Sequence, residues 1–185
     1  QRAVNKAVPG DTIHISSNEF LIDSTILIYS QANLTIRGSY AGTGSPGPTG
    51  SVLTVIRRNP AAGYIRLADI HAATVTVENI DFRNGRLPST SNRLGAGLYI
   101  TGSSRVVIRN GIIADCILPA LNSSLSRGGG LYVESSYLEI RDSQVKNNSM
   151  DGGSWAYENP NGAGMAAVSA IVVVSNVTFA NNINV

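Results

Sequence analysis

Acidic side chains and two histidines are the residues of this sequence that could perform catalysis or hold a metal ion. The acids are scattered singly along the chain, and no two of them are adjacent. A calcium site needs about six converging oxygen ligands, and a glycosidase needs two carboxyl groups at a defined separation. Asp81 and Asp115 could approach each other across a repeat, but their interpretation as surface or ladder residues is favoured. We therefore predict no catalytic residue, metal or cofactor, with calcium and an enzymatic role left open but without support.

Arginines recur at equivalent points of the sequence. Arg109 and Arg141 hold the same position in two copies of a repeated block, where an earlier copy has Glu78 and a still earlier segment has Arg37. Such a row could form a basic stripe for the carboxylates or sulfates of an acidic polysaccharide, because guanidinium groups bind these anions through paired hydrogen bonds. The alternative, which we favour, is a solvated face on which Glu78 pairs with Arg109.

A loop with the only tryptophan is our candidate binding face. It carries Trp155, Tyr157 and Glu158 within the segment 151–161. Exposed aromatic rings on loops bury a large area on a sugar or a protein partner at little cost in rotamer entropy. These rings could instead fold over the apolar flank of the protein, and the sequence leaves both interpretations open.

Four Asn-x-Ser/Thr sequons raise the question of glycosylation. Asn122 lies in a predicted loop and is the best candidate, and Asn33 is the second. The sequons at Asn147 and Asn176 coincide with structural positions described below, which makes them poorer acceptors.

A repeat of about 32 residues organises the second half of the chain. Three glycine clusters, at residues 95–97, 128–130 and 162–164, are each followed by a short apolar run and then by an eleven-residue block. The blocks begin at Val106, Leu138 and Val172, and a copy without the glycine cluster begins at Val75. Their starts are therefore 31, 32 and 34 residues apart. Four aligned copies indicate a repeat architecture.

The block alternates as a strand does and carries short polar residues at two corners. Positions one, three and eight are apolar in every copy, which is strand periodicity. Asn and Asp tolerate left-handed backbone angles and suit tight corners, and stacked Asn side chains can form a ladder of hydrogen bonds. The predicted ladder residues are Asn79, Asn110, Asp142 and Asn176 at position five, and Asn84, Asp115, Asn147 and Asn181 at position ten.

Two further sets of residues recur at equivalent places. Position eleven holds Cys116, where other copies carry Gly or Asn, and we predict a buried or half-buried free thiol because a single cysteine cannot form an internal disulfide. Tyr99 and Tyr132 follow successive glycine clusters, and Tyr64 could extend their row. We interpret this row as structural.

These patterns predict an all-β fold, a right-handed parallel β-helix of about five to six coils with loops that project from one side. We expect one domain over residues 1–185, with an N-terminal cap at 1–11, irregular first coils at 12–63 and regular coils at 64–185. A short capping helix is predicted over residues 2–8. Because the chain starts at Gln1 rather than Met and stops within a repeat, we interpret it as a fragment or processed unit of a longer chain.

The composition agrees with this fold and limits the classes of partner that the chain could bind. Only 14% of the residues are charged while 43% are hydrophobic, so the chain has much to bury and disorder is not expected. A net charge of +2 gives no basis for nucleic-acid binding. No apolar run approaches the roughly 18 residues needed to span a bilayer.

The segments Ala7–Ile15 and Leu34–Ser39 resemble the start of pectin-lyase-like right-handed β-helices. The Gly-x-Gly-Leu-Tyr coils resemble repeats of surface proteins of the polymorphic outer-membrane-protein and adhesin type. Polygalacturonase-like members of the superfamily imply Asn-Thr-Asp, Asp-Asp, Gly-His-Gly and Arg-Ile-Lys motifs, and none of them occurs here. His14 and His71 have other neighbours. The resemblance therefore implies the fold but no activity.

Two classes of function follow. The first is a non-catalytic extracellular or cell-surface β-helix that acts in structure, adhesion or self-assembly. Its partners would be flanking domains or other copies of itself, stacked end to end through an open C-terminal rung, because an unpaired strand edge invites pairing. The second is a polysaccharide-binding module or a carbohydrate-active lyase or hydrolase that uses the loop face.

Overall fold

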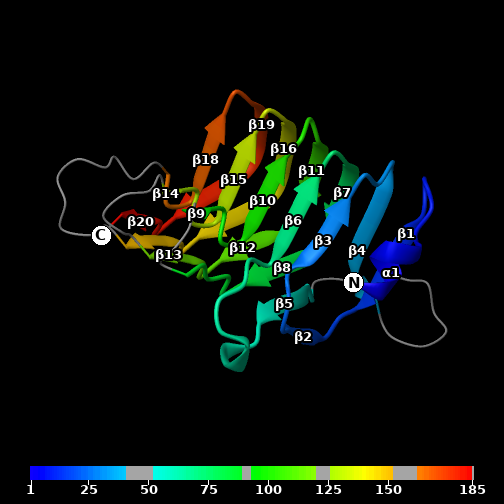
Figure 1. The fold of residues 1–185 in the computed structure, drawn as a ribbon, viewed down its shortest axis with the longest axis horizontal. Helices are drawn as coiled ribbons and strands as arrows, with labels where there is room; N and C mark the ends of the chain where they lie inside the picture. The colour runs from blue at the N-terminus through cyan, green and yellow to red at the C-terminus, as the bar shows by residue number, and fades with distance from the viewer. Residues whose placement is uncertain (41–51, 89–92, 120–125, 152–161, 185) are drawn as a thin grey trace.

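A computed structural model describes residues 1–40, 52–88, 93–119, 126–151 and 162–184. Within these ranges one α-helix, α1 (Arg2–Lys6), and one 3-10 helix (Pro60–Ala62) accompany the strands β1 to β20. Figure 1 shows the strands lying side by side along the long axis, with the N-terminus and the C-terminus toward opposite ends. The chain is an all-β parallel solenoid, as the sequence predicts. No helix of the described ranges is long and apolar enough to cross a membrane.

Equivalent strands of successive coils stack into sheets, and every pair of named strands is parallel. The five-stranded sheet contains β3 (Ile26–Tyr29), β6 (Ala68–His71), β10 (Leu98–Thr101), β15 (Leu131–Glu134) and β18 (Met165–Val168). The ten-stranded sheet has one arm with β1 (Thr12–Ser16), β4 (Leu34–Tyr40), β7 (Thr74–Glu78) and β11 (Arg105–Arg109). Its other arm has β2 (Glu19–Ile22), β5 (Thr54–Arg58), β8 (Ile80–Arg83) and β12 (Ile112–Ala114). The long strands β16 (Tyr137–Lys146) and β19 (Ile171–Ala180) run through both arms.

The number of turns is smaller than the sequence suggests. The five-stranded sheet has four steps between its first and last strands, which corresponds to about four turns rather than the expected five to six coils. The difference arises because the chain makes incomplete coils at both ends, and the sequence count included them.

A coil also contains more strands than the three that the repeat predicts. The additional strands follow position eleven of the block or precede the glycine cluster, and they are only two or three residues long. They are β13 (Ile117–Pro119), β17 (Ser149–Asp151) and β20 (Ile183–Asn184), which form one sheet, and β9 (Arg93–Leu94) and β14 (Ser126–Arg127), which form another.

The blocks stack in register, which places the same position of each copy in one column. Val106 pairs with Val75 on one side and with Leu138 on the other, and Leu138 pairs with Val172. Positions one, three and eight face inward in every copy, and in the interior rungs they form the core. In the blocks that start at Val106 and Leu138 these side chains are at most 1% exposed.

Left-handed backbone at each corner turns the chain from one strand to the next. All eight predicted corner residues have a positive φ, between 47° at Asn110 and 62° at Asn84. A third set of corners follows the five-stranded sheet, and four of its five members are serines that the sequence did not single out: Ser30, Ala72, Ser103, Ser135 and Ser169.

The glycine clusters are required by close contact between rungs. Gly128 opens its cluster with a φ of 67°, which favours glycine. At Gly130 an added Cβ would lie 2.7 Å from the side-chain nitrogen of Asn148 and 2.7 Å from the carbonyl oxygen of Gly164. The position-eleven side chain and the next rung therefore leave no room for a side chain at the end of the cluster.

The capping helix is shorter than predicted and covers one side of the solenoid. Helix α1 ends at Lys6 rather than residue 8: Ala7 is already extended, and Pro9 disfavours helical backbone at Val8, the residue before it. The Gln1 side chain accepts a hydrogen bond from the Leu27 amide at 2.8 Å and donates to the Leu27 carbonyl at 2.9 Å. Gln1 thus occupies part of the free edge of β3.

A buried asparagine ladder ties the last rungs together inside the solenoid. Asn148 is fully buried, and its Oδ1 accepts a hydrogen bond from the Cys116 amide at 3.1 Å. Its Nδ2 donates to the Ile113 carbonyl at 3.1 Å and to Oδ1 of Asn182 at 3.0 Å. These bonds satisfy polar groups that would otherwise be buried without partners.

We predict that Asn148→Ala lowers the free energy of unfolding by about 3 kcal/mol, because it leaves buried donors and acceptors unpaired. Asn147→Gly is the matched control. It removes an exposed amide at the adjacent corner and keeps the positive φ permissible, so its expected cost is below about 1 kcal/mol. Urea denaturation measures both, and equal losses would contradict this account of the inner ladder.

Candidate functional site

The predicted corner residues form two exterior ladders. At position five, Asn110 donates to Asn79 at 2.7 Å, and Asn176 donates to Asp142 at 2.8 Å. At position ten, Asn147 donates to Asp115 at 3.2 Å and Asn181 donates to Asn147 at 3.3 Å. Asn84 has the corner conformation, with a φ of 62°. These residues fix the stacking of the coils.

Each arginine of the row is paired with a neighbouring acid, and Arg37 and Arg109 share one. Arg37 and Arg109 pair in register with Glu78, and both donate to its carboxylate, with Arg109 Nη1 at 3.3 Å. Arg141 lies one rung further and pairs with Glu139, at 3.5 Å from Nε to Oε1. This arrangement is that of a charge-paired face, and polysaccharide binding by Arg109 and Arg141 stays a prediction.

The aromatic loop and one sequon lie outside the described residues. They are Trp155, Tyr157, Glu158 and Asn122. Of the predicted glycosylation sites, Asn33 is described, and it is an exposed corner residue with a φ of 56° immediately before β4. Its exposure satisfies one requirement of an acceptor site.

Asp81 and Asp115 lie in adjacent rungs, as their sequence positions allow. Both carboxylates face the guanidinium group of Arg83 rather than a metal site. Arg83 Nη2 lies 2.7 Å from Asp81 Oδ2, and its Nη1 lies 3.6 Å from Asp115 Oδ2. The hydrogen bond to Asp81 raises the pKa of the Arg83 guanidinium. Among the described residues no three His, Cys, Asp or Glu side chains are grouped as metal ligands would be.

Sequence reasoning missed a connected cluster on the outward face of the five-stranded sheet. Arg66 donates to Asp69 at 3.1 Å and to the Leu94 carbonyl at 2.7 Å, and its guanidinium lies 4.3 Å from the centre of the Tyr99 ring. Burial lowers the pKa of Arg66, and the Asp69 charge opposes this effect. Tyr99 stacks on Tyr132 with ring centres 5.7 Å apart.

Tyr64 does not continue the tyrosine row. The register partner of Tyr99 in β6 is Asp69, and Tyr64 lies before that strand with Arg86 5.6 Å from its ring centre. The contact of Arg66 with Tyr99 joins two coils, and Arg66 precedes the first complete repeat. It could therefore be recognised only once the register between coils was known.

The C-terminal rung, which comprises β18, β19 and β20, exposes residues whose equivalents in the interior rungs are core. Val174 and Phe179 are 46% and 44% exposed, while Ile140 and Val145, their partners in β16, are 0% exposed. Within the described residues β19 pairs only with β16. The rung therefore presents an apolar surface and an unpaired strand edge.

Cys116 is buried and free, in agreement with its position in the block. Burial raises the pKa of its thiol from 9.0 to about 12. A thiol that stays protonated at neutral pH is a poor nucleophile and a poor metal ligand. Cys116 therefore belongs to the core and not to a reactive site.

Comparison with protein families gave one match. A family model described as a right-handed beta helix region matches residues 7–184. Comparison with curated proteins and with solved structures gave no match. The matched range includes every strand from β1 to β20.

We predict that, as the pH rises above 9.0, the free energy of unfolding falls more steeply for the unmodified protein than for the Cys116→Ser variant. The thiol ionises near pH 9.0 in the unfolded chain but near pH 12 in the folded chain. Between these values the unfolded state binds fewer protons, so the contribution of Cys116 is present below pH 9.0 and is lost as the pH rises. Denaturant unfolding at a series of pH values measures the two slopes, and identical slopes would contradict the burial of Cys116.

Proposed function

Because the chain belongs to the right-handed beta helix family, whose fold specifies no chemistry by itself, we propose that it is a non-catalytic structural protein of the cell surface or extracellular space. It self-associates through its C-terminal rung. The observation that carries this proposal is the exposure of Val174 and Phe179 at positions that are core in the interior rungs.

The composition of β19 supports the same function. The strand has ten residues, Ile171–Ala180, and none of them is charged. Natural sheet edges are usually protected by charged residues, proline or a short strand. By contrast, the preceding strand β16 carries four charged residues, Glu139, Arg141, Asp142 and Lys146. An edge without such protection pairs readily with another strand, and a second copy of the chain supplies one.

We predict that the chain self-associates with increasing concentration and that Val174→Lys abolishes the association. The lysine would place a charge in the core of the joined coils, where it has no partner. Sedimentation equilibrium measures the effect, and the variant is expected to remain at the chain mass of 19.4 kDa.

Val173→Lys is the matched control. Val173 is the adjacent residue of β19 and is 43% exposed, but its side chain faces outward in the column of Glu139. A lysine there remains solvated after association, so this variant should associate as the unmodified chain does. Equal loss in both variants, or association of Val174→Lys, would contradict the proposal.

A further inference from the structure

We propose that the surface joined by the C-terminal rung is the N-terminal rung of a second copy, formed by β1, β2 and β3, so that the chains stack head to tail. This inference rests on the proposed self-association and specifies its partner surface. It is carried by the two inward columns of the ten-stranded sheet, each of which ends in exposed or half-buried apolar residues at both ends of the solenoid.

The first column runs through every coil in register. Its members pair in the order Ile13, Ile36, Val77, Ile108, Ile140 and Val174. Ile108 and Ile140 are at most 1% exposed, whereas Val174 at one end is exposed and Ile13 at the other is half-buried. Head-to-tail stacking would place Val174 of one copy on Ile13 of the next.

The second column behaves in the same way. Its members pair in the order Phe20, Ile56, Phe82, Ile113, Val145 and Phe179. Phe20 is 38% exposed and Phe179 is 44% exposed, so an aromatic side chain stands at each end. Both pairs can form together because β19 spans the two arms that β1 and β2 begin, as β16 spans β11 and β12.

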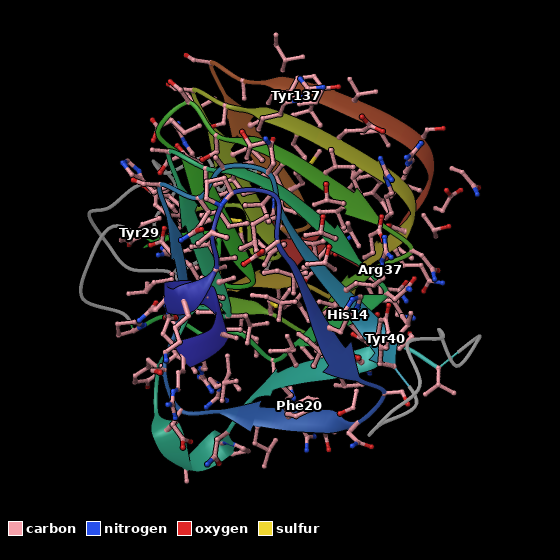
Figure 2. All side chains as sticks on the ribbon, turned by 90° about the vertical axis from the view of Figure 1, so that its right-hand side faces the viewer. His14, Phe20, Tyr29, Arg37, Tyr40 and Tyr137 are labelled. Carbon is pink, nitrogen blue, oxygen red and sulfur yellow. The ribbon has the colours of Figure 1, made fainter. Side chains whose placement is uncertain are left out.

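The cap at the N-terminal end covers part of the β3 edge and leaves β1 and β2 accessible (Figure 2). Figure 2 looks at that end and shows α1 to one side, near Tyr29, with β1 and β2 in front of the solenoid. Helix α1 buries only Val4, and an apolar cavity of about 260 Å³ lies beneath it, lined by Ile13, Ile36 and Phe82 among others. The first coils thus have an incompletely filled interior that faces the second copy.

The C-terminal rung has a small side chain where the helix of the second copy would lie. In the five-stranded sheet the inward column runs through Ile28, Ile70, Ile100 and Val133 to Ala167. Ala167 is exposed, and it is the smallest side chain of this column. It lies on the side where α1 caps β3, so head-to-tail stacking would set α1 against the position with the least side-chain volume.

The test uses two single-end variants of the full 185-residue chain. Phe20→Lys blocks the N-terminal rung and leaves the C-terminal rung intact, and Val174→Lys does the reverse. Each variant alone is expected to be monomeric, and an equimolar mixture is expected to form a dimer with one intact interface. Leu21→Lys is the matched control for the N-terminal rung, because Leu21 is 50% exposed but faces outward beside Arg57.

A disulfide experiment checks the register without a charge substitution. In a Cys116→Ser background, a chain with Val174→Cys is mixed with a chain with Ile13→Cys and oxidised. Residues stacked in adjacent rungs are about 4.8 Å apart, within the Cα separations that disulfides span. The mixed disulfide should form at least about tenfold faster than with Val173→Cys, whose side chain faces the opposite way.

The outcomes separate this inference from the proposed function. A dimer only in the mixture, together with the mixed disulfide, supports head-to-tail stacking. If Phe20→Lys alone still associates and Val174→Cys links to itself, the C-terminal rungs join each other and this inference is overturned. If the unmodified chain does not associate at any concentration, the proposed function itself fails.

Discussion

In-register stacking of each rung on its neighbour is the constraint on which the rest of this structure depends. Parallel strands lie about 4.8 Å apart and repeat with the coil, so a side chain in one rung contacts its equivalent in the next. Every position must therefore tolerate a copy of itself above and below. Apolar positions form continuous columns, corner asparagines bond to one another, and glycine appears where the position-eleven side chain leaves no space.

The same constraint explains why the ends of the solenoid are chemically different from its middle. Among the described residues, one in an interior rung has two equivalent neighbours, whereas one in the first or last rung has only one. The N-terminal rung is partly covered by α1, with Gln1 bonded to the edge of β3. The C-terminal rung has no such cover in the described residues and carries uncharged β19 as its edge. This is the surface at which we propose that the chain associates.

Much of this could be predicted from the sequence because the repeat encodes both period and register. The apolar positions of the block, such as Val106 and Ile108, and corner residues such as Asn110 follow from four aligned copies. The internal role of Asn148 could not, because position eleven varies among Gly, Cys and Asn and its direction depends on the preceding corner. The Arg66–Tyr99 contact was also missed, since it joins residues of different coils and Arg66 lies outside the blocks.

Native-state hydrogen exchange of the β19 amides tests the central claim most directly. In a parallel pair, half of the amides of β19 point toward β16 and the other half point away from it. If the C-terminal rung joins another rung, the amides that point away from β16 gain protection from exchange as the protein concentration rises. The amides that point toward β16 stay protected throughout. If the amides that point away from β16 exchange fast at every protein concentration, the claim that this edge is an assembly surface is contradicted.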